Sequence, residues 1–570
     1  MSENKNSRRV FLKWLGATGG LISVHSTFGA AGQIKNTAKT LSKLSSINKS
    51  AILKKIGPID YNITMSDDSN YLGDQPQLKA HPILWDKENF LKTNKIPEPE
   101  MTTPLVIIGG GMSGLASAYL LRKYKPIILE QANRLGGNAK GEVWNGLPYS
   151  VGAAYYMEQT PGTELYKLFE EVGAHAVCRI KNEEDPTLFD NQFFNNFWKG
   201  ETNPEKKAQF LKLAGYFRDV FNETNNRIFP EIPLAISKFS EDLKMTGHLA
   251  DLDKYNFKDF LEKKILDNEA LHPQIETMLE HYFWSTFASP LKDVSAAQGL
   301  NAYASEFGKV YTAPGGNSAV AECFLKKILQ TVPAQNMKTD SLVVDVLVKP
   351  DHTLVTYSDS AGVLHTIKAK VAVMACPKFI VKHILRDIEP ERLSAIAKLK
   401  YRAYIVGNVL IDQKNPQSFY DLFLLDGGKD PEKSQVTDVI SSNYAPKKHF
   451  NQSVLTLYRG YPYDAGRSNL YDPESFKSYK DEMEKQLSEQ ILPSLKFKKE
   501  NVKSIRITRW GHPMPVPTPG LIADGTVELI RRPFKERVFF IEQDNWMLAA
   551  IETSVEEALY WSKEIKQMLG

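Results

Sequence analysis

The stretch LVIIGGGMSG at Leu105–Gly114 decides the fold of this chain. Its first four residues are apolar and mostly β-branched, which predicts a strand buried on both faces of a parallel sheet. Glycines then follow in the GxGxxG spacing, and Leu115–Tyr124 has a helical composition. A strand, a glycine-rich loop and a helix in this order predict the first βαβ unit of a dinucleotide-binding domain. We therefore expect an α/β fold.

Each part of the loop has a mechanical role in this motif. Gly109 permits the tight turn, Gly111 lets the backbone approach the pyrophosphate, and Gly114 lets the helix pack closely on the strand. Met112 and Ser113 lead into the helix, whose N-terminus offers free N–H groups and the positive end of the helix dipole. The loop is therefore expected to bind the phosphates of a dinucleotide.

A carboxylate ends the second apolar run of the chain. Ile127–Leu129 leads into Glu130, which lies 21 residues after Gly109. At that offset, an acid is expected to accept hydrogen bonds from the adenosine ribose hydroxyls.

The next stretch, QANRLGGN at 131–138, resembles the second signature of FAD-binding amine oxidases, R-x-G-G-R. In that family the paired glycines allow the ribityl-phosphate arm of the flavin to lie on the backbone. An asparagine stands here in place of the last arginine of the pattern. The resemblance implies FAD, with contacts at Gln131, Arg134, Gly136, Gly137 and Asn138. Because no cysteine occurs near the C-terminal strand, we expect the FAD to be held without a covalent bond.

Two segments in the middle of the chain resemble the flavin-containing amine oxidase superfamily. YTAPGGNSAVA at 311–321 is similar to the P-x-G-G segment that opens a helix in that family. The hairpin expected over 342–357 is similar to the one in which the backbone of a valine meets the adenine. Either Val343 or Val344 takes that place here.

The C-terminal segments resemble the same superfamily. RVFFIEQD at 537–544 is similar to the strand that ends in an acid at the ribityl chain, which implies that role for Asp544. The N-terminus of the helix that follows faces the flavin in the family, which implies contacts at Ala550 and Ile551. RWGHPMP at 509–515 is similar to a W-G-x-x-P segment that lines the substrate cavity. The candidate catalytic contacts are Trp510, as an aromatic wall over the flavin, and His512.

The resemblance implies a Rossmann-type FAD-binding domain that is discontinuous in sequence, with an inserted mixed α+β substrate domain. The expected division is a signal over 1–31, a linker and N-terminal extension over 32–100, FAD-binding segments at 101–160, 305–400 and 505–570, and substrate or cap segments at 161–304 and 401–504.

The leader contains SRRVFLK at Ser7–Lys13, which resembles the twin-arginine export signal at every position of its S-R-R-x-F-L-K pattern. The apolar run Trp14–Ala31 is interrupted by glycines, which makes it too weakly apolar for a good spanning helix. The leader predicts that the twin-arginine translocase exports the folded protein, with its cofactor bound, to the periplasm.

Charge and cysteine content limit the function classes. Residues 1–60 contain ten basic and two acidic side chains, and the rest of the chain contains 61 basic and 65 acidic ones. The body is therefore mildly acidic, which gives no support for a nucleic-acid partner and suits a cationic substrate. The three cysteines are far apart and have no CxxC spacing, so no metal or haem site is expected.

In the family, a hydride leaves the carbon next to an amine and arrives at flavin N5. The resemblance therefore implies oxidation of an amine or polyamine. Many members carry a lysine that holds a water at N5, on the strand corresponding to YIVGNVLI at 404–411, which has none. Its absence favours a quinone or periplasmic electron acceptor over oxygen.

Two other functions suit the same scaffold: oxidation or desaturation of a carotenoid-like or porphyrinogen-like substrate, and a non-catalytic electron-transfer role. An acid-containing cavity would favour the amine, and a wholly apolar one the carotenoid-like or porphyrinogen-like substrate.

Overall fold

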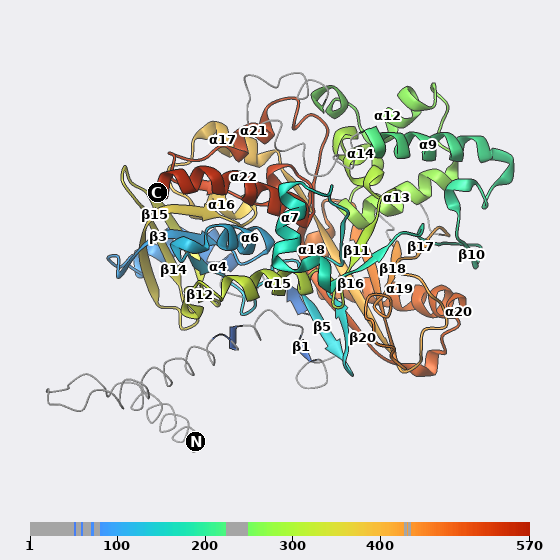
Figure 1. Ribbon diagram of the computed structural model, residues 1–570, viewed down its shortest axis with the longest axis horizontal. Helices are drawn as coiled ribbons and strands as arrows, with labels where there is room; N and C mark the ends of the chain where they lie inside the picture. The colour runs from blue at the N-terminus through green and yellow to red at the C-terminus, as the bar shows by residue number, and fades with distance from the viewer. Residues whose placement is uncertain are drawn as a thin grey trace, which may run out of the picture. The chain divides into compact units, whose positions relative to one another are not determined.

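In the computed structural model, the glycine-rich loop joins β3 (Met101–Ile108) to α6 (Met112–Leu120), and the chain returns in β4 (Ile127–Leu129). β3 and β4 are parallel, with Val106 opposite Ile127. This is the predicted βαβ unit, drawn in blue in Figure 1.

The structure describes residues 49, 51–52, 59–60, 70–72, 80–223, 249–426, 430 and 435–570. Residues 51–570 form one compact unit. The predicted export signal over residues 1–31 lies outside the described residues. Among the helices that are described, none has both the length and the apolar character needed to cross a membrane.

β3 lies inside a seven-stranded sheet that is assembled from three separate parts of the chain. The strand order is β12 (Met337–Lys338), β4, β3, β15 (Leu364–Met374), β14 (Thr353–Ser358) and β13 (Leu342–Val348), with β21 (Val538–Phe540) also paired to β15. β15 is parallel to β3 and β21, whereas β13, β14 and β15 form an antiparallel meander. The predicted α/β fold, the hairpin over 342–357 and the discontinuous Rossmann-type unit are therefore confirmed.

The apolar run that begins the motif is buried on both faces, as predicted. Leu105 and Ile107 pack with α6, α15 (Ser318–Ile328) and α22 (Ile551–Leu569) in one core cluster. Val106 and Ile108 pack on the other face with β13, β14 and α16 (Lys378–Ile384). Burial of each such side chain contributes about 2 kcal/mol to folding. The strand is therefore firmly held where its carboxyl end meets the loop.

A second, eight-stranded sheet comes mainly from the segments expected to form the substrate domain. Its order is β10 (Gln192–Phe194), β9 (Thr187–Phe189), β17 (Phe423–Leu424), β18 (Asp438–Ser441), β19 (Ser453–Tyr461), β16 (Lys400–Ile411), β20 (Val502–Val516) and β2 (Asn70–Leu72). β20 pairs with β16 from Ile411–Val502 to Lys400–Val516. The expected boundary at residue 505 therefore cuts through a continuous strand, because the ladder holds residues 505–516 in this sheet.

Helices and two small sheets complete the described architecture. α9 (Lys207–Glu223), α12 (Phe257–Phe260), α13 (Pro273–Phe287) and α14 (Ala296–Ser305) share one aromatic-rich core, and they lie together in Figure 1. The small sheets are β1 (Ile59–Asp60), β5 (Gly141–Trp144) and β6 (Leu147–Ser150), and β7 (Tyr155–Met157), β11 (Val310–Thr312) and β8 (Arg179–Lys181).

Candidate active site

A cavity of about 280 Å³ opens at the carboxyl end of β3 and extends toward the eight-stranded sheet. Its walls come from the segments that follow β3, β15 and β21, from strands of the eight-stranded sheet and from α13. The lining residues include Gly111–Ser113, Gly136–Ala139, Gly152–Met157, Tyr282, Ser285, Thr286, Asn317, Tyr404, Val406, Tyr458, Trp510, Pro513, Met514, Glu542–Asp544 and Leu548–Glu552. The structure thus brings together the two predicted flavin signatures, the C-terminal segment and Trp510.

The glycine-rich loop has the geometry that its spacing predicts. A Cβ atom on Gly114 would lie 2.0 Å from the carbonyl oxygen of Gly109, so only glycine allows this approach of helix and strand. Gly137 also packs closely on the loop, since a Cβ atom added to it would lie 2.9 Å from Gly111 Cα. Gly111 caps α6 without any side-chain hydrogen bond to the first turn. The N–H groups of that turn therefore have no side-chain cap, and Gly111, Met112 and Ser113 line the cavity.

Glu130 supports this loop directly. Its Oε2 accepts from the backbone N–H of Gly110 at 2.7 Å, and its Oε1 accepts from Ala132 at 2.8 Å. The N–H of Ser341 donates to the Glu130 carbonyl oxygen at 2.8 Å, which brings the start of β13 to this acid. Contact of Glu130 with a ribose stays a prediction. Each carboxylate oxygen has a further lone pair that could accept a hydrogen bond from a ribose hydroxyl.

Several predicted cofactor residues lie outside the described cavity wall. Val343 and Val344 are buried near the start of β13. Ser341, just before this strand, donates its backbone N–H to the Glu130 carbonyl oxygen. Gln131 is exposed. Arg134 is buried, and its guanidinium donates to the carbonyl oxygen of Gly141 at 3.0 Å. For these residues the structure shows scaffold contacts, and their contacts with a cofactor stay predictions.

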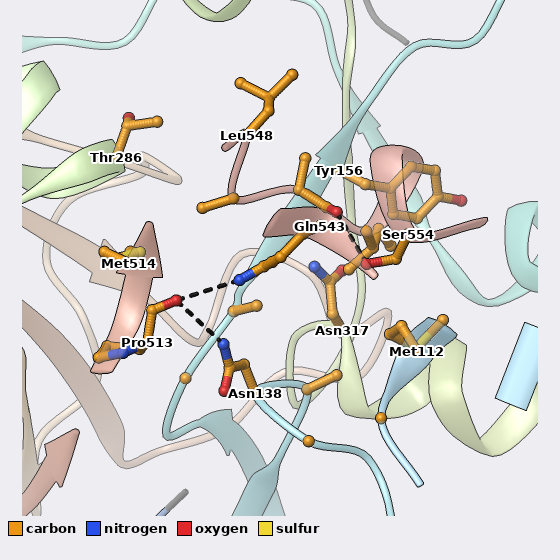
Figure 2. A pocket seen from close by; sticks show the side chains of 18 of the residues that line it. Met112, Asn138, Tyr156, Thr286, Asn317, Pro513, Met514, Gln543, Leu548 and Ser554 are labelled. Atoms are coloured by element: carbon orange, nitrogen blue, oxygen red, sulfur yellow. Dashed lines mark hydrogen bonds between the residues drawn. The ribbon is translucent and has the colours of Figure 1, made fainter. Parts of the chain in front are cut away.

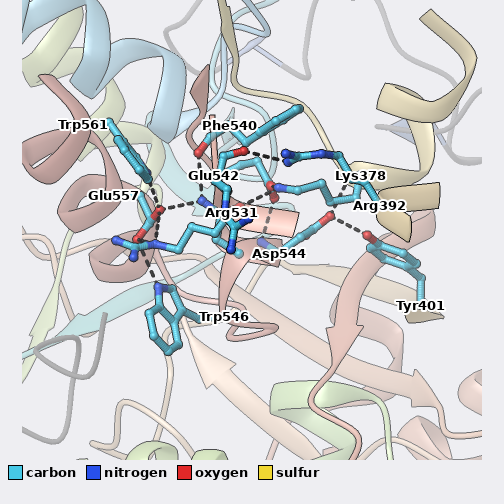
Figure 3. Close-up of polar contacts among 12 residues, drawn as sticks. Lys378, Arg392, Tyr401, Arg531, Phe540, Glu542, Asp544, Trp546, Glu557 and Trp561 are labelled. Carbon is cyan, nitrogen blue, oxygen red and sulfur yellow. Dashed lines mark hydrogen bonds and ion pairs between the residues drawn. The ribbon is translucent and has the colours of Figure 1, made fainter. Parts of the chain in front are cut away.

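Two neighbouring acids, Glu542 and Asp544, line the cavity. A buried lysine, Lys378, contacts both of them (Figure 3). Lys378 Nζ pairs with Glu542, and the backbone N–H of Lys378 donates to Asp544 Oδ2 at 3.0 Å. Tyr401 donates to the same oxygen of Asp544 at 2.5 Å. Burial and the neighbouring Asp544 raise the pKa of Glu542 to about 8, against the effect of Lys378. Sequence reasoning named Asp544 alone, although Glu542 begins the same acidic stretch.

The start of α22 reaches the cavity between these acids and the loop. Ala549, Ala550 and Ile551 all line it, and Ala550 caps the helix without a side-chain hydrogen bond. The helix N-terminus therefore reaches the cavity, and its contact with a flavin stays a prediction. In Figure 2, Asn317 and Ser554 lie on the side of the pocket opposite Thr286 and Met514.

These residues fit FAD. Two uncapped helix N-termini suit negatively charged oxygens, and the contact between Gly111 and Gly137 leaves backbone open to a phosphate chain. Asn317 Nδ2 donates to the Tyr155 carbonyl at 2.7 Å, while its buried Oδ1 has no hydrogen-bond partner among the described residues. Because a buried polar atom is normally paired, that oxygen indicates a donor supplied by a bound group.

Aromatic side chains form the wall on the eight-stranded sheet. Trp510 and Tyr404 are paired residues on β20 and β16, and Tyr458 lies on β19. The rings of Tyr404 and Tyr458 are 5.8 Å apart and inclined by 68°. The Trp510 indole donates to the Val151 carbonyl at 3.0 Å, and Tyr458 donates to the Gly152 carbonyl at 2.7 Å. These bonds fix the positions of Trp510 and Tyr458, and all three aromatic residues line the cavity.

His512, the other predicted catalytic contact, does not line this cavity. Its Nδ1 accepts from Arg467 at 3.2 Å, and its ring packs on Phe379 with centroids 4.4 Å apart. The register of β16 against β20 shifts between Arg402 and Tyr404, so the side-chain alternation along β20 is broken between Trp510 and His512. That bulge turns the histidine away from the wall that Trp510 forms.

Hydroxyl groups of α13 form the adjoining wall. Tyr282, Ser285 and Thr286 all line the cavity, and their spacing places them on one helix face. Tyr282 donates to Glu306 Oε1 at 2.8 Å, and Tyr155 lies 3.4 Å from the same oxygen. Ser285 Oγ lies 3.3 Å from the Tyr404 hydroxyl. The hydroxyls therefore separate the cavity from the partly buried carboxyl of Glu306.

Further carboxyl groups surround this wall. Asp438, hydrogen-bonded to Ser285, has its pKa raised to about 7, chiefly by burial. Burial and the nearby Asp438 raise the pKa of Asp421 well above its ordinary value. Glu552 lines the cavity itself, and burial raises its pKa to about 7. The site therefore combines aromatic faces with an excess of buried acids, which suits a cation.

Residues 112–559 match the family of flavin-containing amine oxidoreductases. The chain belongs to this family. It is therefore an FAD-dependent oxidoreductase. The individual residues that hold the FAD stay predictions. FAD, when bound, supplies an acceptor for the hydride of a substrate.

Relatives of this amine oxidoreductase include Oxidoreductase PigB of Serratia sp., 22% identical over 545 residues that cover 86% of this chain and 80% of that protein. A putrescine oxidase bound to putrescine has a similar structure, with a TM-score of 0.59 at 15% identity over 82% of this chain and 99% of that chain. A protein described as a protoporphyrinogen oxidase, from Exiguobacterium sp., has a TM-score of 0.56 at 16% identity over 83% and 100%. At these identities the likeness to both structures shows the fold.

Proposed function

We propose that this flavoprotein oxidises the carbon next to the nitrogen of an amine or polyamine. The observation that carries the proposal is the acid content of the cavity. Glu542, Asp544 and Glu552 line it, and Glu306 and Asp438 lie directly behind its hydroxyl wall. A wholly apolar lining would have suited a carotenoid-like or porphyrinogen-like substrate.

The physical support comes from what buried acids and aromatic rings do to a cation. In an interior of low effective dielectric constant, a carboxylate attracts an ammonium group several times more strongly than it does in water. The faces of Trp510, Tyr404 and Tyr458 add cation–π attraction and keep water from the reacting carbon. The same rings position an alkyl chain.

The test is anaerobic mixing of the FAD-loaded protein with a panel of mono-, di- and polyamines, followed by the flavin absorbance. Bleaching by one or more amines, and none by alcohols of the same length, is expected. If a porphyrinogen or polyene bleaches the flavin and no amine does so, the amine proposal is wrong. If nothing bleaches a fully loaded flavin that dithionite still reduces, an electron-transfer role replaces catalysis.

The electron acceptor is the second part of the proposal. The side chains of β16 that line the cavity are Tyr404 and Val406, so no lysine of this strand reaches it. We infer that the reduced flavin passes its electrons to a quinone or a periplasmic carrier. Turnover with a soluble quinone, with little hydrogen peroxide formed in air, is expected. Rapid stoichiometric peroxide formation would contradict this part.

Export by the twin-arginine translocase is the third part, and it rests on Ser7–Lys13. Folded export would explain why a protein that needs FAD acts in the periplasm. Replacing Arg8 and Arg9 by lysine is expected to leave the protein in the cytoplasm with FAD bound. Unchanged periplasmic location of this variant would contradict the export proposal and leave the catalytic one intact.

A further inference from the structure

A hydrogen-bonded path runs from the cavity wall to Glu306, a partly buried carboxyl that does not itself line the cavity. Thr286 and Tyr282 are both part of the wall. The Tyr282 hydroxyl donates to Glu306 Oε1 at 2.8 Å. Tyr155, also in the wall, lies 3.4 Å from the same oxygen. A proton at the wall can therefore reach Glu306 through one tyrosine hydroxyl.

The surroundings of Glu306 set its proton affinity. Burial raises its pKa to about 7, while Lys181 acts in the opposite direction. Lys181 is itself paired with Asp185, which partly neutralises the positive charge that Glu306 experiences. Six titratable groups face Glu306. They are Lys181 on β8, Asp185 in the loop after β8, Tyr155 on β7, Tyr282 on α13, Tyr303 on α14 and Glu552 on α22. Near neutral pH this carboxyl can thus both take and release a proton.

An amine substrate creates the need for such a group. A primary alkylamine has a pKa of about 10 in water, so it arrives as an ammonium ion. Hydride can leave the neighbouring carbon only when the nitrogen lone pair is free, which requires the neutral amine. A buried cavity must therefore contain an acceptor for the ammonium proton. An exposed glutamate, about 300-fold less basic than one with the pKa of Glu306, is a poorer acceptor.

We propose that Glu306 accepts the proton of the substrate ammonium group through the hydroxyl of Tyr282. The N–H bond of the ammonium breaks as the Tyr282 oxygen takes that proton, and the Tyr282 O–H proton moves to Glu306 Oε1. The lone pair stays on nitrogen, the carboxylate becomes a carboxylic acid, and Tyr282 is neutral before and after. No electrons are exchanged in this step. The inference rests on the proposed amine substrate.

The test compares Glu306→Gln and Tyr282→Phe with Glu280→Gln. Glu280 is a matched control because it lies on α13, is buried with a pKa raised to about 7, and does not line the cavity. Its Oε2 accepts from the Leu291 N–H at 3.1 Å instead. Glu306→Gln removes the acceptor, and Tyr282→Phe cuts the path while it leaves the carboxyl in place.

The first measurement is the anaerobic flavin reduction rate at saturating amine, with the amine dissociation constant, from pH 6 to 9. In the wild type the rate is expected to rise with pH, with a midpoint near 7. Both test variants should lose about 100-fold in rate at neutral pH, as for a removed general base, with little change in the dissociation constant. The loss should disappear with a β-fluorinated amine that is already neutral at the assay pH.

The second measurement needs no turnover. An amine without hydrogen on the carbon next to nitrogen binds but cannot be oxidised, and infrared difference spectra then report carboxyl protonation. A new carboxylic acid C=O band is expected for the wild type and for Glu280→Gln, and no such band for Glu306→Gln.

Other results would overturn the inference. A higher dissociation constant with an unchanged rate in Glu306→Gln would mean that Glu306 only attracts the ammonium ion. Equal rate losses in Glu306→Gln and Glu280→Gln would mean a structural effect. If the wild-type flavin is reduced by no amine and the inert amine fails to bind, the proposed function itself is wrong, and the inference with it.

Discussion

Tyr401 donates its hydroxyl hydrogen to Asp544 Oδ2 at 2.5 Å, although the two residues lie 143 positions apart. Tyr401 belongs to β16 of the eight-stranded sheet, and Asp544 follows β21 of the seven-stranded sheet. The contact therefore joins the two layers at the end of the cavity where the predicted ribityl acid lies.

Replacement of Tyr401 by phenylalanine should weaken FAD binding. A hydrogen bond to a charged group contributes about 1.5–3 kcal/mol, and its loss frees the Asp544 carboxylate to move. We expect the FAD dissociation constant to rise at least about ten-fold, measured by equilibrium dialysis or flavin fluorescence. Tyr444→Phe removes a comparable bond, to Glu183 at 2.6 Å, away from the cavity, and should leave FAD affinity unchanged. Equal effects of both variants would contradict the prediction.

Alanine at Gly114 should prevent FAD binding and destabilise the fold. Its Cβ would lie 2.0 Å from the Gly109 carbonyl oxygen, which forces α6 away from β3 at a cost of about 3 kcal/mol. Flavin content after purification and the urea midpoint measure both effects. Gly215→Ala is the control, because nothing lies within 4 Å of the added Cβ and the site is inside α9. There alanine should raise stability by about 0.5–1 kcal/mol and leave FAD content unchanged.

Removal of the buried carboxyl of Glu280 should change how stability depends on pH. Burial raises the pKa of this group from 4.5 to about 7, so the folded state binds its proton more tightly than the unfolded state. Its contribution is fully present below about pH 4.5 and is lost as the pH rises through about 7. For each protein, urea unfolding gives the decrease in the free energy of unfolding from pH 5 to pH 8. This decrease should be larger for the wild type than for Glu280→Gln by up to about 3 kcal/mol. An identical difference in both proteins would rule this out.

A buried ion pair between β5 and β20 should be costly to break. Arg506 donates to Glu142 Oε1 and Oε2, both at 2.6 Å, and Tyr149 donates to Oε2 at 2.7 Å. Glu142→Gln leaves a buried guanidinium without its counter-charge, at a cost of about 3–5 kcal/mol in the free energy of unfolding. The exposed pair Lys212–Asp267, at 2.8 Å, is the control, and Asp267→Asn should cost less than about 1 kcal/mol. Similar losses in the two variants would be the contrary outcome.

The parts of the site that could be predicted lie close together in sequence. Gly109, Gly114 and Glu130 belong to one strand–loop–helix–strand unit, so their spacing already implies their geometry. Trp510 was found by its motif. Glu552 lies inside the C-terminal segment that resembles the family, and Lys378 follows Pro377, shortly after β15 ends. No spacing rule marks either residue as part of a buried acid network.

The sequence by itself determined the dinucleotide loop, the α/β fold and the flavin family, because local patterns and contiguous motifs encode them. Tertiary structure alone decided that Glu306 lies behind Tyr282, that Asp438 lies behind Ser285, and that His512 turns away from Trp510. The first two depend on packing between segments far apart in the chain, and the third on a register shift in one strand pair. The raised pKa values arise chiefly from burial, which no local pattern specifies. The chemistry proposed for the cavity therefore rests on contacts that form only when the two sheets pack together.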